Sequence, residues 1–383
     1  MRGQDTRTQP AAYPPPRPSP SRGEGDPFSA YWHTFMAELV EMLPQHRIDG
    51  HALARVLERR LEGVWAALEI KQFQGGQSNP TYLLDAGTQR YVLRKQPPGP
   101  LLPKAHQIDR EHRVMAALAG TGVPVPRMCH YESDASIIGT PFYVMAHVEG
   151  RSVADLGMAE LRREDRRAMA ASLLTTLARL HSLDWRLLGL ADFGRPDGYA
   201  RRQAERWSKQ YAASKTADIP DMDRLGAWLL AHVPDDERAS IAHGDYRIGN
   251  VIVATDRPEV CAVLDWELST IGHPLADLAY CLMGYHLPDG GIAGPGLIGR
   301  DLAADGLASE AELIDVYSRA AGIDPPAGLD FFVALALFRL AAIVQGVYAR
   351  SLAGNASSAS AATMGPRVAA LAAAGLAVIA RAG

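Results

Sequence analysis

Short runs of alternating apolar and polar residues dominate residues 64–150, and turn-forming segments such as GGQSNP and GTQ separate them. Alternation with a period of two is typical of strands that bury one face, and Gly, Asn and Pro between such runs indicate tight turns. One helical run at 106–120 interrupts them and stops at a glycine. We therefore expect one helix and five antiparallel strands, at residues 64–73, 81–87, 90–95, 123–133 and 141–150.

The residues before these strands predict a tail and two helices. Residues 1–27 are rich in Pro, Arg and Ser and almost lack large aliphatic side chains, so they cannot bury enough surface to offset chain entropy. We expect a disordered tail there. Apolar residues then recur every three or four positions from Phe28 to Met42, and residues 51–61 continue the helical pattern. Residues 28–150 thus form a first lobe of two N-terminal helices followed by a β-sheet with the one helix at 106–120.

Residues 151–383 carry mostly helical periodicity. The exception is a pair of apolar runs at 241–253 and 259–268, which predicts a β-hairpin inserted among helices. The fold class is therefore α+β, with a small sheet lobe followed by a larger helical lobe. The helical runs lie at residues 163–183, 198–211, 222–233, 311–322, 330–352 and 368–380.

Composition excludes several classes of function. The 39 Lys and Arg residues are outnumbered by 43 Asp and Glu, which leaves no basic excess for nucleic acid. The clean apolar run at 368–380 is too short to span a membrane, and no apolar segment follows the basic N-terminus as in a secretory signal. The three cysteines, Cys129, Cys261 and Cys281, have no metal-ligand spacing and indicate reduced core thiols. We expect a cytoplasmic protein without nucleic-acid or membrane partners.

The segment IAHGDYRIGNVIV at 241–253 carries the candidate chemistry. Asp245 and Asn250 precede one strand of the expected hairpin, and Asp265 follows the other, so the hairpin brings Asp265 beside Asn250. An amide oxygen and a carboxylate suit Mg²⁺, which takes its other ligands from phosphates and water. Asp245 is then free to accept a proton. This division of roles is the one that phosphoryl transfer requires.

These motifs resemble those of the aminoglycoside phosphotransferase family of kinase-like small-molecule kinases, whose loop reads H-G-D-x-x-x-x-N. The resemblance spans roughly residues 70–350 and is strongest to the branch associated with acyl-CoA dehydrogenases. It implies a bilobal, protein-kinase-like fold and the cofactors ATP and Mg²⁺. It also implies a catalytic role for Asp245, metal binding by Asn250 and Asp265, and support of the loop by His243 and Asp277.

The resemblance also implies a set of nucleotide contacts. The segment FQGGQSNP aligns with the family's nucleotide loop, although a plain hairpin turn would read the same way and the kinase G-x-G-x-x-G is absent. Residues 141–151 resemble the hinge, where a gatekeeper side chain and two backbone groups would face adenine. The contacts implied are Gly75, Gly76, Ser78 and Asn79 in the loop, and Met145, Ala146 and Val148 in the hinge.

A cation on the third strand should pair with the phosphates. Strand alternation places Arg94 and Lys95 on opposite faces, so only one of them points at ATP. We choose Arg94 because the register V-L-R matches the family, with Lys95 as the alternative. Glu111 in the following helix would be its ion-pair partner, although a surface glutamate is the ordinary reading of that position.

The identity of the phosphate acceptor is the part of the function that the sequence constrains least. The segment GYARRQAERWSKQY places Arg202, Arg206 and Lys209 on one helical stripe beside Trp207, which suits an anionic acceptor or, equally, a solvated face. Arg339 in a later helix raises the same possibility. The family branch implies a small hydroxyl compound such as a hydroxyacyl-CoA ester, with a functional link to an acyl-CoA dehydrogenase.

Two other functions stay open at this point. One is phosphorylation of an aminoglycoside or a choline-type alcohol, and the other is a nucleotide-binding pseudokinase that regulates or scaffolds a partner. Retention of Asp245, Asn250 and Asp265 favours an active enzyme, because a pseudokinase need not keep all three. The sequence therefore predicts an ATP-dependent kinase of a small hydroxyl compound.

Overall fold

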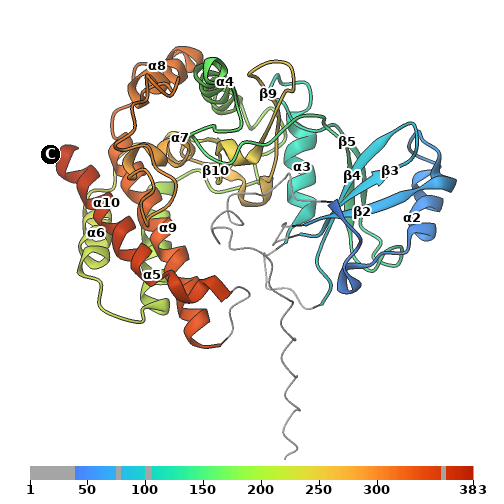
Figure 1. Ribbon diagram of the computed structural model, residues 1–383, viewed down its shortest axis with the longest axis horizontal. Coiled ribbons are helices and arrows are strands. Elements are labelled where there is room, and N and C mark those ends of the chain that lie inside the picture. The colour runs from blue at the N-terminus through green and yellow to red at the C-terminus, as the bar shows by residue number, and fades with distance from the viewer. Residues whose placement is uncertain (1–38, 75–78, 100–105, 355–358, 383) are drawn as a thin grey trace, which may run out of the picture.

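The computed structural model describes residues 39–74, 79–99, 106–354 and 359–382, which form two lobes (Figure 1). The expected tail at 1–27 and most of the first expected helix lie outside these ranges. The second expected helix is present as α2, Gly50–Leu57, and its first turn is capped by the side chain of Asp49.

The first lobe is built on a six-stranded antiparallel sheet in the order β1-β2-β3-β4-β6-β5. Five of its strands confirm the strands predicted from alternation. The strands are β1 Leu39–Val40, β2 Glu69–Phe73, β3 Thr81–Asp85, β4 Arg90–Lys95, β5 Met128–Glu132 and β6 Phe142–Ala146.

The sixth strand corrects the helix expected to reach Met42. Leu39 pairs with Phe73 and Val40 with Gln72, so β1 extends the free edge of β2. The backbone hydrogen bonds that this edge offers outweigh the local helical spacing of a few apolar side chains, a common result of tertiary context.

Each face of the sheet has its own core. On β4, Leu93 belongs to a cluster that includes Leu53 and Leu57 of α2. Val92 points the other way and joins Val114 of helix α3, Ile108–Leu118, in the main core. Helix α3 lies between the sheet and the second lobe (Figure 1), so the α3 face of the sheet is the one turned toward the second lobe.

The second lobe is helical, as predicted, and is organised around α9, Leu329–Leu352, which packs against α5, α7 and α10. By length and composition α9 could cross a membrane, but 78% of its most apolar window is buried inside the protein, as expected of a core helix. The other helices are α4 Arg163–His181, α5 Tyr199–Ser214, α6 Pro220–Ala231, α7 Pro274–Leu282, α8 Glu310–Ala321 and α10 Gly365–Ala382.

Two small strand pairs lie among these helices. Strand β8, Val251–Val253, pairs antiparallel with β9, Val260–Val263, which confirms the predicted hairpin. Strand β7, Ser240–Ala242, pairs with β10, Thr270–Gly272. The short 3-10 helices are η1 Pro44–His46, η2 Trp65–Ala67, η3 Ile248–Asn250, η4 Trp266–Leu268, η5 Met283–His286 and η6 Ala359–Thr363.

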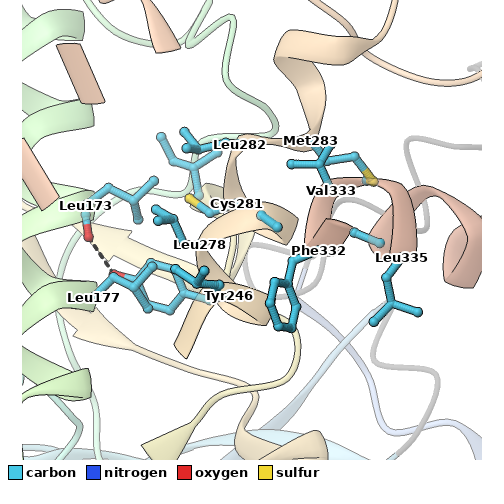
Figure 2. Packing of buried hydrophobic residues seen from close by; sticks show 14 of the residues in the cluster. Leu173, Leu177, Tyr246, Leu278, Cys281, Leu282, Met283, Phe332, Val333 and Leu335 are labelled. Carbon is cyan, nitrogen blue, oxygen red and sulfur yellow. Dashed lines mark hydrogen bonds between the residues drawn. The ribbon is translucent and has the colours of Figure 1, made fainter. Parts of the chain in front are cut away.

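The segment between β7 and β8 rests on the core of the helical lobe (Figure 2). The Tyr246 ring is fully buried, and its hydroxyl donates a 2.8 Å hydrogen bond to the Leu173 carbonyl of α4. Leu177 of α4 and Leu278 of α7 belong to the same cluster. The backbone next to Asp245 is thereby anchored in the main hydrophobic core of the lobe.

This packing predicts that Leu177→Ala destabilises the protein by roughly 2–5 kcal/mol, because a fully buried leucine leaves a cavity when it is truncated. The measurement is the free energy of unfolding from denaturant titration followed by circular dichroism. Leu187→Ala is the matched control, since that side chain is 86% exposed. Equal losses in the two variants would contradict the assignment of Leu177 to the core.

Candidate active site

A buried carboxylate fixes the loop that follows β7. Asp277, in the first turn of α7, accepts hydrogen bonds from the backbone amides of His243 (2.6 Å) and Gly244 (2.8 Å). Its side chain is 2% exposed and lies 3.4 Å from the Nε2 atom of His181. Burial alone would raise the pKa of Asp277, but these hydrogen bonds and the nearby imidazoles outweigh it and lower that pKa. Asp277 is thus held as an anion that orients two consecutive peptides.

Gly244 allows the loop to pass close to the backbone of Leu268. Its φ of 84° lies in the left-handed region, and a Cβ placed there would lie 2.5 Å from the carbonyl oxygen of Leu268. A side chain at this position would therefore need both backbone strain and a shift of the neighbouring segment.

His243 supports the loop and does not act as an acid or a base. Its Nδ1 accepts a hydrogen bond from the Asp245 amide (3.2 Å), so the proton is on Nε2, which donates to the Leu264 carbonyl (2.8 Å). The ring is fully buried and packs on the Trp266 ring, with centroids 4.6 Å apart. Both nitrogens are occupied by backbone partners, which leaves this imidazole no free site for acid or base chemistry.

The Asp245 carboxylate stands at the surface of this arrangement. The Asn250 amide nitrogen donates to its Oδ2 (2.7 Å) and to its backbone carbonyl (2.8 Å). Arg247 Nε lies 3.6 Å from the same carboxylate, and the Tyr280 hydroxyl forms a further hydrogen bond with it. The Asp245 side chain remains 20% exposed, so a substrate can still reach it.

Asn250 and Asp265 meet at one end of the β8–β9 hairpin. Val251 pairs with Val263, and the Leu264 amide donates to the Asn250 carbonyl (2.9 Å), which places Asp265 next to Asn250. Because the Asn250 amide nitrogen is bound to Asp245, its Oδ1 atom points elsewhere. This oxygen is buried and has no hydrogen-bond partner among the described residues.

Asp265 has an unusual backbone conformation, with φ 65° and ψ 56°. A non-glycine residue in the left-handed region is uncommon, although Asp tolerates it better than most residues, and such outliers concentrate at functional sites. A buried amide oxygen without a donor and an adjacent carboxylate are the hard oxygen ligands that Mg²⁺ prefers, so the residues present fit that ion.

Arg94 connects the two lobes. Its guanidinium lies 3.2 Å from Asp265, 3.5 Å from Glu267 and 3.4 Å from Glu111 of α3. Burial by itself would lower the pKa of Arg94, but the neighbouring acids, Glu111 above all, raise it above its ordinary value. The group therefore stays charged between the lobes, beside the Asn250–Asp265 pair.

Glu111 is completely buried and well supported. Asn79 donates to it (2.9 Å), as does the Tyr143 hydroxyl (3.0 Å). Burial raises the pKa of Glu111, whereas Arg94 and these hydrogen bonds favour its charged form. The Asn79 side chain, expected to contact nucleotide, is itself buried and also contacts His106 Nδ1 (3.1 Å), so the structure gives it a supporting position instead.

Lys95 lies on the opposite face of β4, toward α2. It is 3% exposed, and burial lowers its pKa. The pKa of His46 is lowered first by burial and then by the charge of Lys95. Lys95 therefore lies near His46, away from the carboxylates that surround Arg94. Strand alternation thus separates the two cations as expected, with Arg94 facing Glu111 and Asp265.

The expected hinge lies at the end of β6. Met145 is buried beside Val92 of β4, with which it pairs in the sheet. The Ala146 amide donates to the Arg127 carbonyl (2.9 Å), whereas no described group accepts from the amide of the half-buried Val148. The expected contacts Gly75, Gly76 and Ser78 lie outside the described residues.

The expected acceptor residues divide into two groups. Trp207 and Arg339 line a small cavity between α5, α7 and α9, beside the Asp245 loop. Arg206 and Lys209 are exposed on α5, and Arg202 is half-buried and donates to the Arg195 carbonyl (2.6 Å). The lining residues are Tyr199, Gln203, Trp207, Ala276, Tyr280, Phe332, Leu335, Ala336 and Arg339.

Several site residues were not found from the sequence. Glu267 and Arg247 each lie two positions beyond a predicted acid, in segments whose bends the pattern does not reveal. Tyr280 shares a face of α7 with Asp277 through i, i+3 spacing, which was an available signal. His181 gave no signal, because it reaches Asp277 only through the packing of α4 on α7.

Comparison with curated proteins gives acyl-CoA dehydrogenase family member 11 of Rattus norvegicus, 47% identical over 330 residues. The match covers 84% of this chain and 42% of the rat protein. The chain therefore spans less than half the length of this relative.

Solved structures give the fold independently. A candidate aminoglycoside phosphotransferase of Ralstonia eutropha JMP134 matches with a TM-score of 0.80 and 39% identity, over 88% of this chain and 99% of that one. A spectinomycin phosphotransferase solved with ADP and spectinomycin has a TM-score of 0.57 at 10% identity, over 87% and 98% of the two chains, which shows the fold alone. These neighbours confirm the expected protein-kinase-like fold. With the phosphotransferase enzyme family matched over residues 69–327, the chain belongs to that family and is a phosphotransferase that acts on a hydroxyl group.

Proposed function

We propose that this protein is an ATP-dependent kinase that transfers the γ-phosphoryl group of ATP to a hydroxyl group of a small molecule. The observation that carries the proposal is the buried Oδ1 of Asn250, which has no partner in the described part of the chain and lies beside the Asp265 carboxylate, one hydrogen bond away from Asp245. This geometry separates a cation-binding pair from a carboxylate that is open to a substrate.

Asn250 and Asp265 would hold Mg²⁺. When bound, that ion neutralises charge on the β- and γ-phosphates. The chain's own part is to keep both oxygens in place: the Asn250 amide nitrogen is bound to Asp245, and the Leu264 amide ties the backbone of Asn250 to the residue before Asp265.

Arg94 would bind the phosphates from the other lobe. Its guanidinium is held by Glu111, which Asn79 and Tyr143 support in turn, so the cation is placed before nucleotide arrives. A planar guanidinium pairs well with phosphate oxygens, and a preoriented one loses little side-chain entropy on binding.

Asp245 would orient the acceptor hydroxyl and take its proton. The hydroxyl oxygen forms a bond to the γ-phosphorus, the bond from that phosphorus to the β–γ bridging oxygen breaks, ADP leaves, and the proton passes to the Asp245 carboxylate. In a loose transition state the proton moves late, so positioning and charge neutralisation supply most of the rate.

The acceptor that we propose is a hydroxyacyl-CoA, with a functional link to an acyl-CoA dehydrogenase. Support comes from the name of the rat relative and from the exposed Arg206 and Lys209 on α5, which suit the phosphates of a CoA ester. An aminoglycoside or choline would bring positive charge toward Arg339, which argues against a cationic acceptor.

The placement of Arg94 predicts the outcome of two length-preserving substitutions. Arg94→Met should lower kcat/KM for ATP by about tenfold to a hundredfold, because it removes a charged hydrogen-bond donor from the cleft. Lys95→Met should change this constant far less, because Lys95 faces α2. Steady-state ADP release at varied ATP measures both, with thermal melting as a check of folding. The reverse ranking would refute the orientation of β4.

The acceptor is tested by ADP release with hydroxyacyl-CoAs, choline-type alcohols, sugars and aminoglycosides. We expect a hydroxyacyl-CoA to give the highest kcat/KM. In Asp245→Asn, which keeps the shape of the side chain, turnover of that acceptor should fall by roughly 10² to 10⁴ while ATP affinity stays similar.

Each outcome of this panel is informative. Faster turnover of choline or an aminoglycoside would overturn the acceptor and leave the kinase activity in place. Tight ATP binding with no turnover of any compound would overturn the kinase proposal and favour a nucleotide-binding pseudokinase. Unchanged turnover in Asp245→Asn would show that this carboxylate is not the base.

A further inference from the structure

Arg339 of α9 reaches the peptide that carries Asp245. Its Nη1 donates a 2.8 Å hydrogen bond to the carbonyl oxygen of Gly244. That carbonyl belongs to the same planar peptide unit as the Asp245 amide, which donates to His243 Nδ1. The peptide is therefore held at both ends, at one end by an imidazole of its own loop and at the other by a guanidinium 95 residues away.

The same guanidinium is part of the cavity wall. Its central carbon lies 5.1 Å from the ring centroid of Tyr280 and 5.5 Å from that of Trp207, and both rings line the cavity with it. Burial first, and then the charge of Asp245, raise the pKa of Tyr280, so this phenol remains a hydrogen-bond donor to the carboxylate. Arg339 thus contacts the catalytic loop through Gly244 and faces Asp245 across Tyr280.

Arg339 retains unused hydrogen-bonding capacity. Among the residues that the structure describes, its buried Nε has no hydrogen-bond partner, and no carboxylate lies within ion-pair distance of the side chain. A guanidinium has five N–H donors and stays charged, and burying part of such a group without a counter-charge is costly. Aromatic faces compensate for part of this cost. The cavity therefore presents a cation in need of an acceptor oxygen.

We infer that Arg339 binds the acyl oxygen of the acceptor, either a carboxylate or a thioester carbonyl, while it holds the Gly244–Asp245 peptide in position for proton abstraction. This inference rests on the proposed function and names the acyl oxygen as the group of the acceptor that the site recognises. Because Arg339 is one hydrogen bond from the peptide of Asp245, the oxygen that it binds must lie only a few bonds from the reacting hydroxyl. In a hydroxyacyl-CoA that oxygen belongs to the acyl group, since the phosphates lie beyond the pantetheine arm.

The double role makes two separable predictions. Loss of positioning should lower kcat with every acceptor, whereas loss of recognition should raise KM only for acceptors that have an acyl oxygen. A purely structural role for Arg339 would alter all acceptors alike.

The test compares wild type, Arg339→Met and Arg339→Lys with three acceptors: hydroxybutanoyl-CoA, the free hydroxybutanoate, and the corresponding butanediol, in which a neutral hydroxyl, a weaker hydrogen-bond acceptor, replaces the acyl oxygen. In all three the reacting hydroxyl is at the position that the enzyme prefers. Arg350→Met is the matched control, because Arg350 lies on the same helix and is exposed. In Arg339→Met we expect KM to rise by about tenfold to a hundredfold for the acyl acceptors and to stay near wild type for the diol. Arg339→Lys, which keeps the charge, should recover part of the loss.

The two acyl acceptors distinguish the source of the oxygen. A larger KM effect with hydroxybutanoate assigns Arg339 to a carboxylate, and a larger effect with the CoA ester assigns it to the thioester carbonyl. An unchanged KM for both, or an equal rise for the diol, would overturn the inference.

Binding measured by calorimetry separates this inference from the kinase proposal. If wild type transfers no phosphate to any acceptor, the proposed function fails. The inference then still requires that wild type binds hydroxybutanoyl-CoA or hydroxybutanoate and that Arg339→Met binds them at least about tenfold more weakly. Equal affinities in the two proteins would overturn it.

Discussion

The buried carboxylate of Asp277 is the constraint on which the site depends. An anion in the centre of a helical lobe is costly unless strong donors surround it, and here two consecutive backbone amides and the imidazole of His181 do so. These amides belong to His243 and Gly244, so the interaction that keeps the anion stable also sets the direction of the chain into Asp245. Neutralising Asp277 would release two peptides at once, immediately before the Asp245 carboxylate, which we propose as the base.

The second constraint is the polar contact between the lobes. Arg94 comes from the sheet, Glu111 from α3 and Asp265 from the helical lobe, and their charges meet between the lobes, where water is largely excluded. Such a cluster is stable only while each charge has a partner. The nucleotide site that we propose therefore lies where the two lobes share charge, and changes at Arg94 should affect both nucleotide binding and the fit between the lobes.

Much of this architecture follows from local patterns. Alternation predicted the strands, placed Arg94 and Lys95 on opposite faces, and paired the hairpin that brings Asp265 to Asn250. These features depend on neighbours within one strand or one hairpin, where the period of two leaves little freedom. Helical periodicity predicts α4 to α6 and α8 to α10, because that pattern too depends only on residues close together in the chain.

The features that could not be predicted depend on contacts between distant segments. Strand β1 exists because β2 has an open edge, and Asn79 is buried because Glu111 needs a donor. The cavity beside the Asp245 loop is the strongest case: Tyr280 and Arg339 come from α7 and α9, and nothing in either helix indicates that the other will lie beside it. Spacing along the sequence leaves the stripe on α5 open as an acceptor site or a solvated face, and of its residues Trp207 reaches the cavity whereas Lys209 remains in solvent.

The most direct test of the central claim is a crystal structure of the protein with AMP-PNP and Mn²⁺, in which anomalous scattering locates the metal. We expect an anomalous peak within bonding distance of Asn250 Oδ1, the Asp265 carboxylate and the nucleotide phosphates, with Arg94 in contact with those phosphates. Nucleotide in the cleft with no metal at this pair, or with the metal held by other residues, would contradict it.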